Sequence, residues 1–265
     1  MARRGDREGL ARGSFRGSDG ATLAYREIGE GRALVLLHGY LSTAEVNWVR
    51  FGHAQALADR GHRVVMPDLR AHGDSARPHD PAAYLPDILA DDGLALVEHL
   101  GLRDYDLGGY SLGARTTVRM LVRGATPLRA IIAGMGLDAI ERTGPGNEHF
   151  RRILTNPGTF ERGSPEWMAE TFLRQVGGDS VALLRLLDSA VDTPREELGR
   201  IRTPALVAVG AGDEAHRSAE ALAEVLPNGR LVLLPGNHMS AVTKPELALA
   251  IADFLDDPSE DSAGG

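Results

Sequence analysis

The stretch LGGYSLGA places a single serine, Ser111, among small residues. Gly109 and Gly113 flank it at the spacing Gly-x-Ser-x-Gly, which is typical of a nucleophilic serine held on a sharp turn between a strand and a helix. The spacing also occurs by chance, so the flanking residues must show whether Ser111 lies on such a turn. An apolar run at 105–107 precedes the serine, and residues 114–122 have helical periodicity. The context is therefore strand–turn–helix, and a Cβ at either glycine would crowd such a turn.

A serine nucleophile needs a general base and a group that orients the base. His238 lies in a loop after the last strand-like apolar run, and Asp213 lies in the loop after the run before it. Sites in open α/β sheets form at the carboxyl ends of the strands, where both loops lie. Asp213 would accept the imidazole N–H and fix its tautomer. Glu214 and, more distantly, Asp138 remain alternative acids.

The segment His38-Gly39-Tyr40 follows another strand-like run that ends at Leu37. We expect the backbone N–H of Tyr40 to stabilise an oxyanion together with the N–H of Leu112, the residue after the nucleophile. The loss of one such donor typically costs about 2.7–4 kcal/mol of transition-state stabilisation. His38 is expected to be structural or to orient the loop.

Short apolar runs alternate with longer helical patterns along most of the chain. A run without in/out alternation is typical of a strand that helices cover on both faces. The expected strands are 33–37, 63–66, 105–107, 130–133, 205–209 and 231–234. The clearest further helical patterns are 87–100, 218–226 and 246–255. This order predicts an α/β fold with a mostly parallel central sheet flanked by helices.

Two regions depart from this alternation. Residues 14–16 and 23–25 flank a Gly-Ser-Asp-Gly turn and predict an N-terminal antiparallel hairpin. Residues 136–199 contain helical pieces and no convincing strand, and loops longer than about 15 residues are uncommon, so we expect a helical cap. The predicted domains are a core of 14–135 and 200–256 and a cap of 136–199, with flexible tails at 1–13 and 257–265.

Composition excludes several classes of function. The 265 residues carry a formal net charge of −8, which disfavours binding to nucleic acid or to anionic membranes. There is no cysteine, so disulfides and thiol catalysis are excluded. No apolar run is long enough to cross a bilayer, and the N-terminus lacks the apolar core of a signal peptide, so a cytoplasmic location is expected. We expect a small-molecule substrate, no metal and no organic cofactor; the oligomeric state cannot be read from the sequence.

The chain order Ser111, Asp213, His238 is the order of an α/β-hydrolase triad. With these motifs the sequence resembles the α/β-hydrolase fold superfamily from about residue 23 to residue 255. Residues 68–75 (DLRAHGDS) are similar to that family's loop after the second parallel strand, although alanine stands where glycine is common. The usual role of that loop is structural, so Arg70 and His72 are not assigned to catalysis.

The resemblance also implies a branch of chemistry. Haloalkane dehalogenases and soluble epoxide hydrolases of this superfamily use aspartate as the nucleophile, and dienelactone hydrolases use cysteine. Ser111 favours a carboxylesterase for small or medium acyl or alcohol groups. A lactonase, a thioesterase, a cofactor-free perhydrolase and a carbon–carbon bond hydrolase remain open. A prolyl-type aminopeptidase is disfavoured because Leu112 stands where tryptophan is usual. The alternative from another class is a non-catalytic ligand-binding protein of the same fold.

A few apolar residues of the predicted cap would then roof the substrate pocket, while most of them pack the cap onto the core. The candidates are Met135, Leu137, Phe150, Ile153, Leu154, Trp167, Met168, Phe172 and Leu173.

Overall fold

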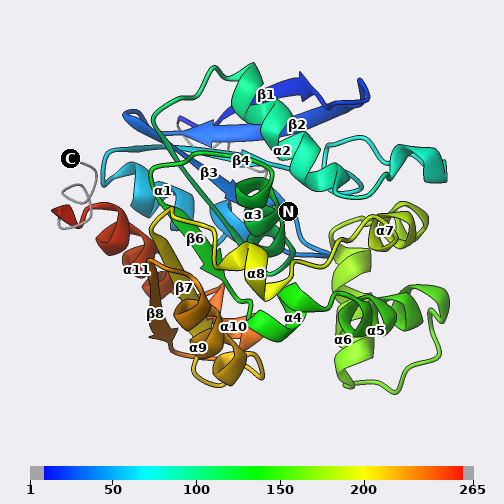
Figure 1. The fold of residues 1–265 in the computed structure, drawn as a ribbon. Coiled ribbons are helices and arrows are strands. Elements are labelled where there is room, and N and C mark those ends of the chain that lie inside the picture. The colour runs from blue at the N-terminus through cyan, green and yellow to red at the C-terminus, as the bar shows by residue number, and fades with distance from the viewer. Residues whose placement is uncertain (1–8, 259–265) are drawn as a thin grey trace.

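The computed structural model describes residues 9–258, which fold around one eight-stranded sheet (Figure 1). The strand order is β1-β2-β4-β3-β5-β6-β7-β8. The strands are β1 Ala11–Arg16, β2 Thr22–Ile28, β3 Arg32–Leu37, β4 His62–Pro67, β5 Tyr105–Tyr110, β6 Ala130–Ala133, β7 Ala205–Gly210 and β8 Gly229–Leu234. β1 pairs antiparallel with β2, and β2 pairs antiparallel with β4, whereas all other pairs are parallel. The predicted parallel sheet with an N-terminal hairpin is confirmed.

Helices cover both faces of the sheet (Figure 1). Those outside the insertion are α1 His53–Ala58, α2 Ile88–His99, α3 Leu112–Val122, α9 His216–Val225, α10 His238–Ala241 and α11 Pro245–Leu255, with a short π-helix at Glu45–Val49 and a 3₁₀ turn at Pro81–Ala83. Leu34 and Leu36 of β3 pack in a cluster with α1 and α11. Val35 and Leu37 of the same strand pack in a cluster with α2. Successive residues of β3 thus face opposite layers, which explains its uninterrupted apolar run.

The insertion between β6 and β7 is helical, as predicted. Its helices are α4 Leu137–Glu141, α5 Gly144–Thr155, α6 Pro165–Gln175, α7 Ser180–Leu187 and α8 Arg195–Leu198. The first and the last of them pack on the core, because Leu137 and Leu198 share one apolar cluster with α3 and α9. α5, α6 and α7 lie to one side of the sheet in Figure 1, and the name "cap" is used below for these three helices.

The apolar residues expected to roof the pocket fall into different environments. Leu137 is buried against the core. Leu154 and Leu173 of the cap are buried in one cluster with α2, which joins the cap to the core. Met168, by contrast, is 53% exposed.

The ends of the described chain differ in part from the expectation. Ala11 begins β1 and Gly13 pairs with Tyr25, so residues 11–13 belong to the sheet and not to a flexible tail. Residues 1–8 and 259–265, which make up most of the two predicted tails, lie outside the described residues. Within residues 9–258, no helix combines the length and the apolar character that crossing a membrane would require.

Candidate active site

Ser111 occupies a strained turn between β5 and α3. Its backbone has φ 55° and ψ −112°, and its N–H donates to the carbonyl of Ala133 on the neighbouring strand β6 at 2.8 Å. A Cβ built on Gly109 would lie 2.3 Å from the carbonyl carbon of Gly113, and one built on Gly113 would lie 2.2 Å from the carbonyl oxygen of Leu37. Only glycine fits at either position, and the strained turn holds the serine side chain at the carboxyl end of the sheet.

His238 is the first residue of α10, and its neighbours fix the start of that helix. The side chain of Asn237 accepts from the amide of Ser240 at 3.0 Å, and the Ser240 hydroxyl accepts from the amide of Asn237 at 2.9 Å. This is a capping box. Tyr110, directly before the serine, donates its phenol proton to the His238 carbonyl at 2.6 Å. Burial raises the pKa of Tyr110, so the phenol stays a donor.

Asp213 reaches His238 because the loops after β7 and β8 touch. The amide of Gly212 donates to the carbonyl of Gly236 at 2.9 Å, and a Cβ on Gly210 would lie 2.5 Å from that same oxygen. Asp213 therefore lies beside the loop that carries His238.

The three side chains form one hydrogen-bonded row. His238 Nε2 lies 3.1 Å from Ser111 Oγ, and His238 Nδ1 lies 3.0 Å from Asp213 Oδ2. Burial by itself raises the pKa of Asp213, but the hydrogen bonds from His238 and from the Ala215 amide outweigh it, so this pKa lies below its ordinary value. The acid is therefore ionised and acts as an acceptor for the imidazole N–H.

The two alternative acids lie elsewhere. Glu214 is exposed, and no hydrogen bond or ion pair joins it to any of residues 9–258. Asp138 is exposed at the start of α4, where its amide donates to Ser218 Oγ at 2.7 Å. The structure thus brings Ser111, His238 and Asp213 together and leaves both alternatives outside the row.

The loop 38–40 adjoins the serine. A Cβ built on Gly39 would lie 3.5 Å from Ser111 Cβ, and the Gly39 amide donates to Asn47 Oδ1 at 3.0 Å. Within residues 9–258, neither the Tyr40 amide nor the Leu112 amide donates to a protein acceptor. Both N–H groups are therefore free to bind a developing oxyanion.

His38 holds this loop in place without taking part in the row. Its Nε2 accepts the Leu69 amide at 3.0 Å, so Nδ1 carries the proton that is donated to the Gly39 carbonyl at 2.9 Å. Burial lowers the pKa of His38, which keeps the ring neutral. The ring is fully buried. His38 therefore orients the loop and is not a second base.

The segment 68–75 connects the surroundings of the loop 38–40 to other parts of the core. Asp68 accepts from the Ala44 amide at 2.9 Å and pairs with Arg26 at 2.8 Å. Arg70 is fully buried and pairs with Asp92 at 2.8 Å and Asp19 at 2.7 Å. These ion pairs join the segment to β2, α2 and the first hairpin, so Arg70 has a structural role.

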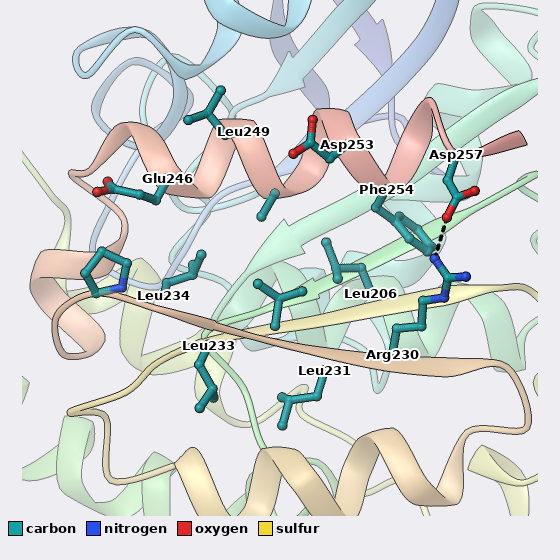
Figure 2. A pocket seen from close by; sticks show the side chains of 13 residues that line it. Leu206, Arg230, Leu231, Leu233, Leu234, Glu246, Leu249, Asp253, Phe254 and Asp257 are labelled. Carbon is teal, nitrogen blue, oxygen red and sulfur yellow. Dashed lines mark hydrogen bonds and ion pairs between the residues drawn. The ribbon is translucent and has the colours of Figure 1, made fainter.

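A groove of about 690 Å³ lies away from this site, between the edge strand β8 and α11 (Figure 2). Apolar side chains such as Leu233 and Leu249 line it, and an Arg230–Asp257 ion pair closes one end at 2.7 Å. None of the three residues of the hydrogen-bonded row lines this groove. The hydrogen-bonded row at the carboxyl end of the sheet is therefore separate from this groove.

Comparison with known proteins agrees with this geometry. The sequence pattern of the alpha/beta hydrolase family matches residues 34–251. The chain belongs to this family. A hydrolase from Pseudomonas aeruginosa PA01 has a similar solved structure, with a TM-score of 0.76 and 27% identity over 95% of this chain and 100% of that one.

Curated relatives match over shorter stretches. A non-heme haloperoxidase from Rhodococcus erythropolis is 36% identical over 109 residues, which are 40% of this chain and 37% of the relative. Epoxide hydrolase 2 from Siraitia grosvenorii is 31% identical over 98 residues, 37% of this chain and 30% of the relative. The alignments thus span less than half of the length of these two relatives.

Two contributors to the site were not predicted from the sequence. The first is Tyr110, whose phenol holds the backbone of His238. The second is the capping box of Asn237 and Ser240, for which the spacing of an amide and a hydroxyl three residues apart was an available signal.

Proposed function

We propose that this alpha/beta hydrolase is a serine carboxylesterase that cleaves esters with small or medium acyl or alcohol groups through an acyl-enzyme. The observation that carries the proposal is the row from Ser111 Oγ through His238 to Asp213, next to two amides that donate to no acceptor in the described part of the chain. A serine at this position favours acyl transfer over epoxide opening, for which the resemblance implies an aspartate nucleophile.

The proposed reaction has two halves. His238 Nε2 takes the proton of Ser111 Oγ as the oxygen attacks the ester carbonyl, and the Tyr40 and Leu112 amides bind the oxyanion. His238 then gives this proton to the leaving alcohol as the ester C–O bond breaks. In the second half His238 deprotonates a water molecule that attacks the acyl carbonyl, and Ser111 regains its proton as the acid leaves. Asp213 stabilises the imidazolium in both halves.

Hydrolysis of p-nitrophenyl acetate and butyrate tests this proposal. We expect steady turnover by the wild type and a loss of at least about 10⁴-fold in Ser111→Ala, because the nucleophile is removed. Ser180→Ala, at the start of α7 and outside the row, is the matched control. A fluorophosphonate should label Ser111 in the wild type, as read by peptide mass spectrometry. Retained activity in Ser111→Ala would refute the mechanism, and tight stoichiometric binding without turnover would indicate the ligand-binding alternative.

A cofactor-free perhydrolase is the second candidate, and the stretch that is 36% identical to the haloperoxidase favours it. Hydrogen peroxide would replace water in the second half, and attack on the acyl-enzyme would release a peracid and free Ser111. Peracid formation from acetate esters and peroxide, measured beside hydrolysis, separates the two. We expect hydrolysis to dominate; a faster peroxide reaction would select the second candidate.

A further inference from the structure

Among residues 9–258, Arg115 is a cation without an anionic partner, one helical turn after the proposed nucleophile. Its amide donates to the Ser111 carbonyl at 3.1 Å, which places it in the first turn of α3. Its Nε is buried and has no hydrogen-bond partner. Among residues 9–258, no ion pair or side-chain hydrogen bond involves its guanidinium.

The arginines that follow on the same helix are paired. Arg119 binds Asp87 through Nε at 2.9 Å, and Arg123 binds Asp91 at 2.6 Å. The acid whose charge acts on Arg115 is Asp192, but its Oδ1 already accepts the amide and the hydroxyl of Thr143. Burial lowers the pKa of Arg115, and the charge of Asp192 only partly opposes this effect.

This position is unfavourable for a cation in the free protein. A positive charge in the first turn of a helix opposes the helix dipole, and the buried Nε without a partner adds a desolvation cost, although the side chain as a whole is only partly buried. Helical side chains lean toward the N-terminus, which directs Arg115 toward the turn of Ser111 and Leu112. A bound anion would remove both penalties.

A small cavity is present at this place. Leu112 and Arg115 line it together with residues 189–191, which follow α7, and its volume is about 40 Å³. The hydroxyl of Ser189, which also lines it, is already used in a hydrogen bond to the Leu186 carbonyl at 2.8 Å. A group of the size of one water or slightly more fits such a space. Asp87 and Arg119 also line the cavity, but they bind each other, with Arg119 Nε 2.9 Å from Asp87 Oδ1. Arg115 therefore supplies the unpaired guanidinium of the cavity.

We propose that Arg115 binds a carboxylate at the end of the acyl group that Ser111 carries, so that the preferred substrates are half-esters of short dicarboxylic acids. This inference rests on the proposed esterase function. The planar guanidinium matches a carboxylate with two parallel hydrogen bonds. Arg115 follows Ser111 by four residues of helix, about 6 Å along the axis, a separation that a short dicarboxylic acyl chain can span.

Paired substrates test the inference. Monoethyl glutarate and ethyl pentanoate have acyl chains of equal length, but only the first carries a carboxylate. We expect the wild type to prefer the anionic ester in kcat/KM, and Arg115→Met to reduce this preference roughly 10- to 100-fold with little change on the neutral ester. Arg115→Lys keeps the charge but cannot form the two parallel hydrogen bonds, and it should retain part of the preference. Arg185→Met is the matched control, because its Nε is also buried without a partner but lies on α7 outside the cavity.

Binding gives a readout that does not need turnover. Glutarate should bind Ser111→Ala in calorimetry and should bind at least tenfold more weakly when Arg115→Met is added. If the wild type cleaves both esters equally through Ser111, the inference is wrong and the proposed function stands. If glutarate binds through Arg115 and no ester is cleaved, the esterase function is wrong and the carboxylate site stands. Equal binding of chloride at the same concentration would reduce the site to a general anion site and overturn the inference.

Discussion

The phenol of Tyr40 donates a hydrogen bond of 2.9 Å to the carbonyl of Leu183 on α7. The amide of the same residue is one of the two free donors beside Ser111. The Tyr40 ring also meets Phe150 of α5, with 4.7 Å between ring centroids. Burial raises the pKa of this phenol, so it remains a donor. One residue thus connects the cap to the predicted oxyanion site, and the position of the cap should affect catalysis and not only access.

Tyr40→Phe removes the hydrogen bond to Leu183 and leaves the ring in place. We expect the free energy of unfolding to fall by about 1 kcal/mol, the usual net value of such a bond, and kcat for p-nitrophenyl butyrate to fall by a few fold. Tyr84→Phe is the matched control, because Tyr84 is buried and donates to the Pro78 carbonyl at 2.8 Å. It should lose similar stability with unchanged kcat. Equal kinetic effects in both variants would contradict a link between cap and catalysis.

Asp213→Asn should leave the fold intact and lower kcat by about 10⁴-fold. The reason is that an amide can donate to His238 Nδ1 and so favour the wrong imidazole tautomer. Glu214→Gln, one residue further along and exposed, should keep wild-type kcat. Initial rates with p-nitrophenyl acetate check both variants. Full activity in Asp213→Asn together with loss in Glu214→Gln would reassign the acid.

Local signals explain why so much of the site could be predicted from the sequence. Contacts within the turn itself and with the adjoining strand β3 require glycine at positions 109 and 113. Their spacing around Ser111 therefore follows directly from the geometry of the turn. The central strands are buried on both faces, which leaves uninterrupted apolar runs. Asp213 and His238 could be chosen because each follows a strand at the same edge of the sheet.

Contacts between distant segments were not predictable in the same way. The choice of Asp213 over Glu214 depends on the touching loops at Gly212 and Gly236, which no local pattern reveals. The packing of α4 on the core, through Leu137, depends on α9 far along the chain. The side chain of Tyr40 could be assigned to neither core nor cap until the position of Leu183 was known.

Gly113→Ala should strongly destabilise the fold. The added methyl would lie 2.2 Å from the Leu37 carbonyl oxygen, and backbone has to move to relieve the clash. We expect a loss of roughly 2–3 kcal/mol or more in the free energy of unfolding, measured by urea denaturation. Gly146→Ala in α5 meets no atom within 4 Å and should raise stability by up to about 1 kcal/mol. Equal stability of the two variants would show that the turn is less tightly packed than the structure indicates.

Acidification should destabilise the protein through His72. This ring is buried, its Nδ1 donates to the Arg70 carbonyl at 2.9 Å, and its Nε2 has no partner among residues 9–258. Burial lowers the pKa of His72 to about 3, and the unfolded value is about 6.5. Because the folded pKa is the lower one, the neutral ring contributes full stability above about pH 6.5, and this contribution is lost as the pH falls toward 3. His38 and His53 act in the same direction.

His72→Gln cannot take up this proton, so its Tm should fall less than that of the wild type between pH 7.5 and pH 5, as measured by calorimetry. Parallel Tm curves for the two proteins would show that the His72 ring is not the group that titrates.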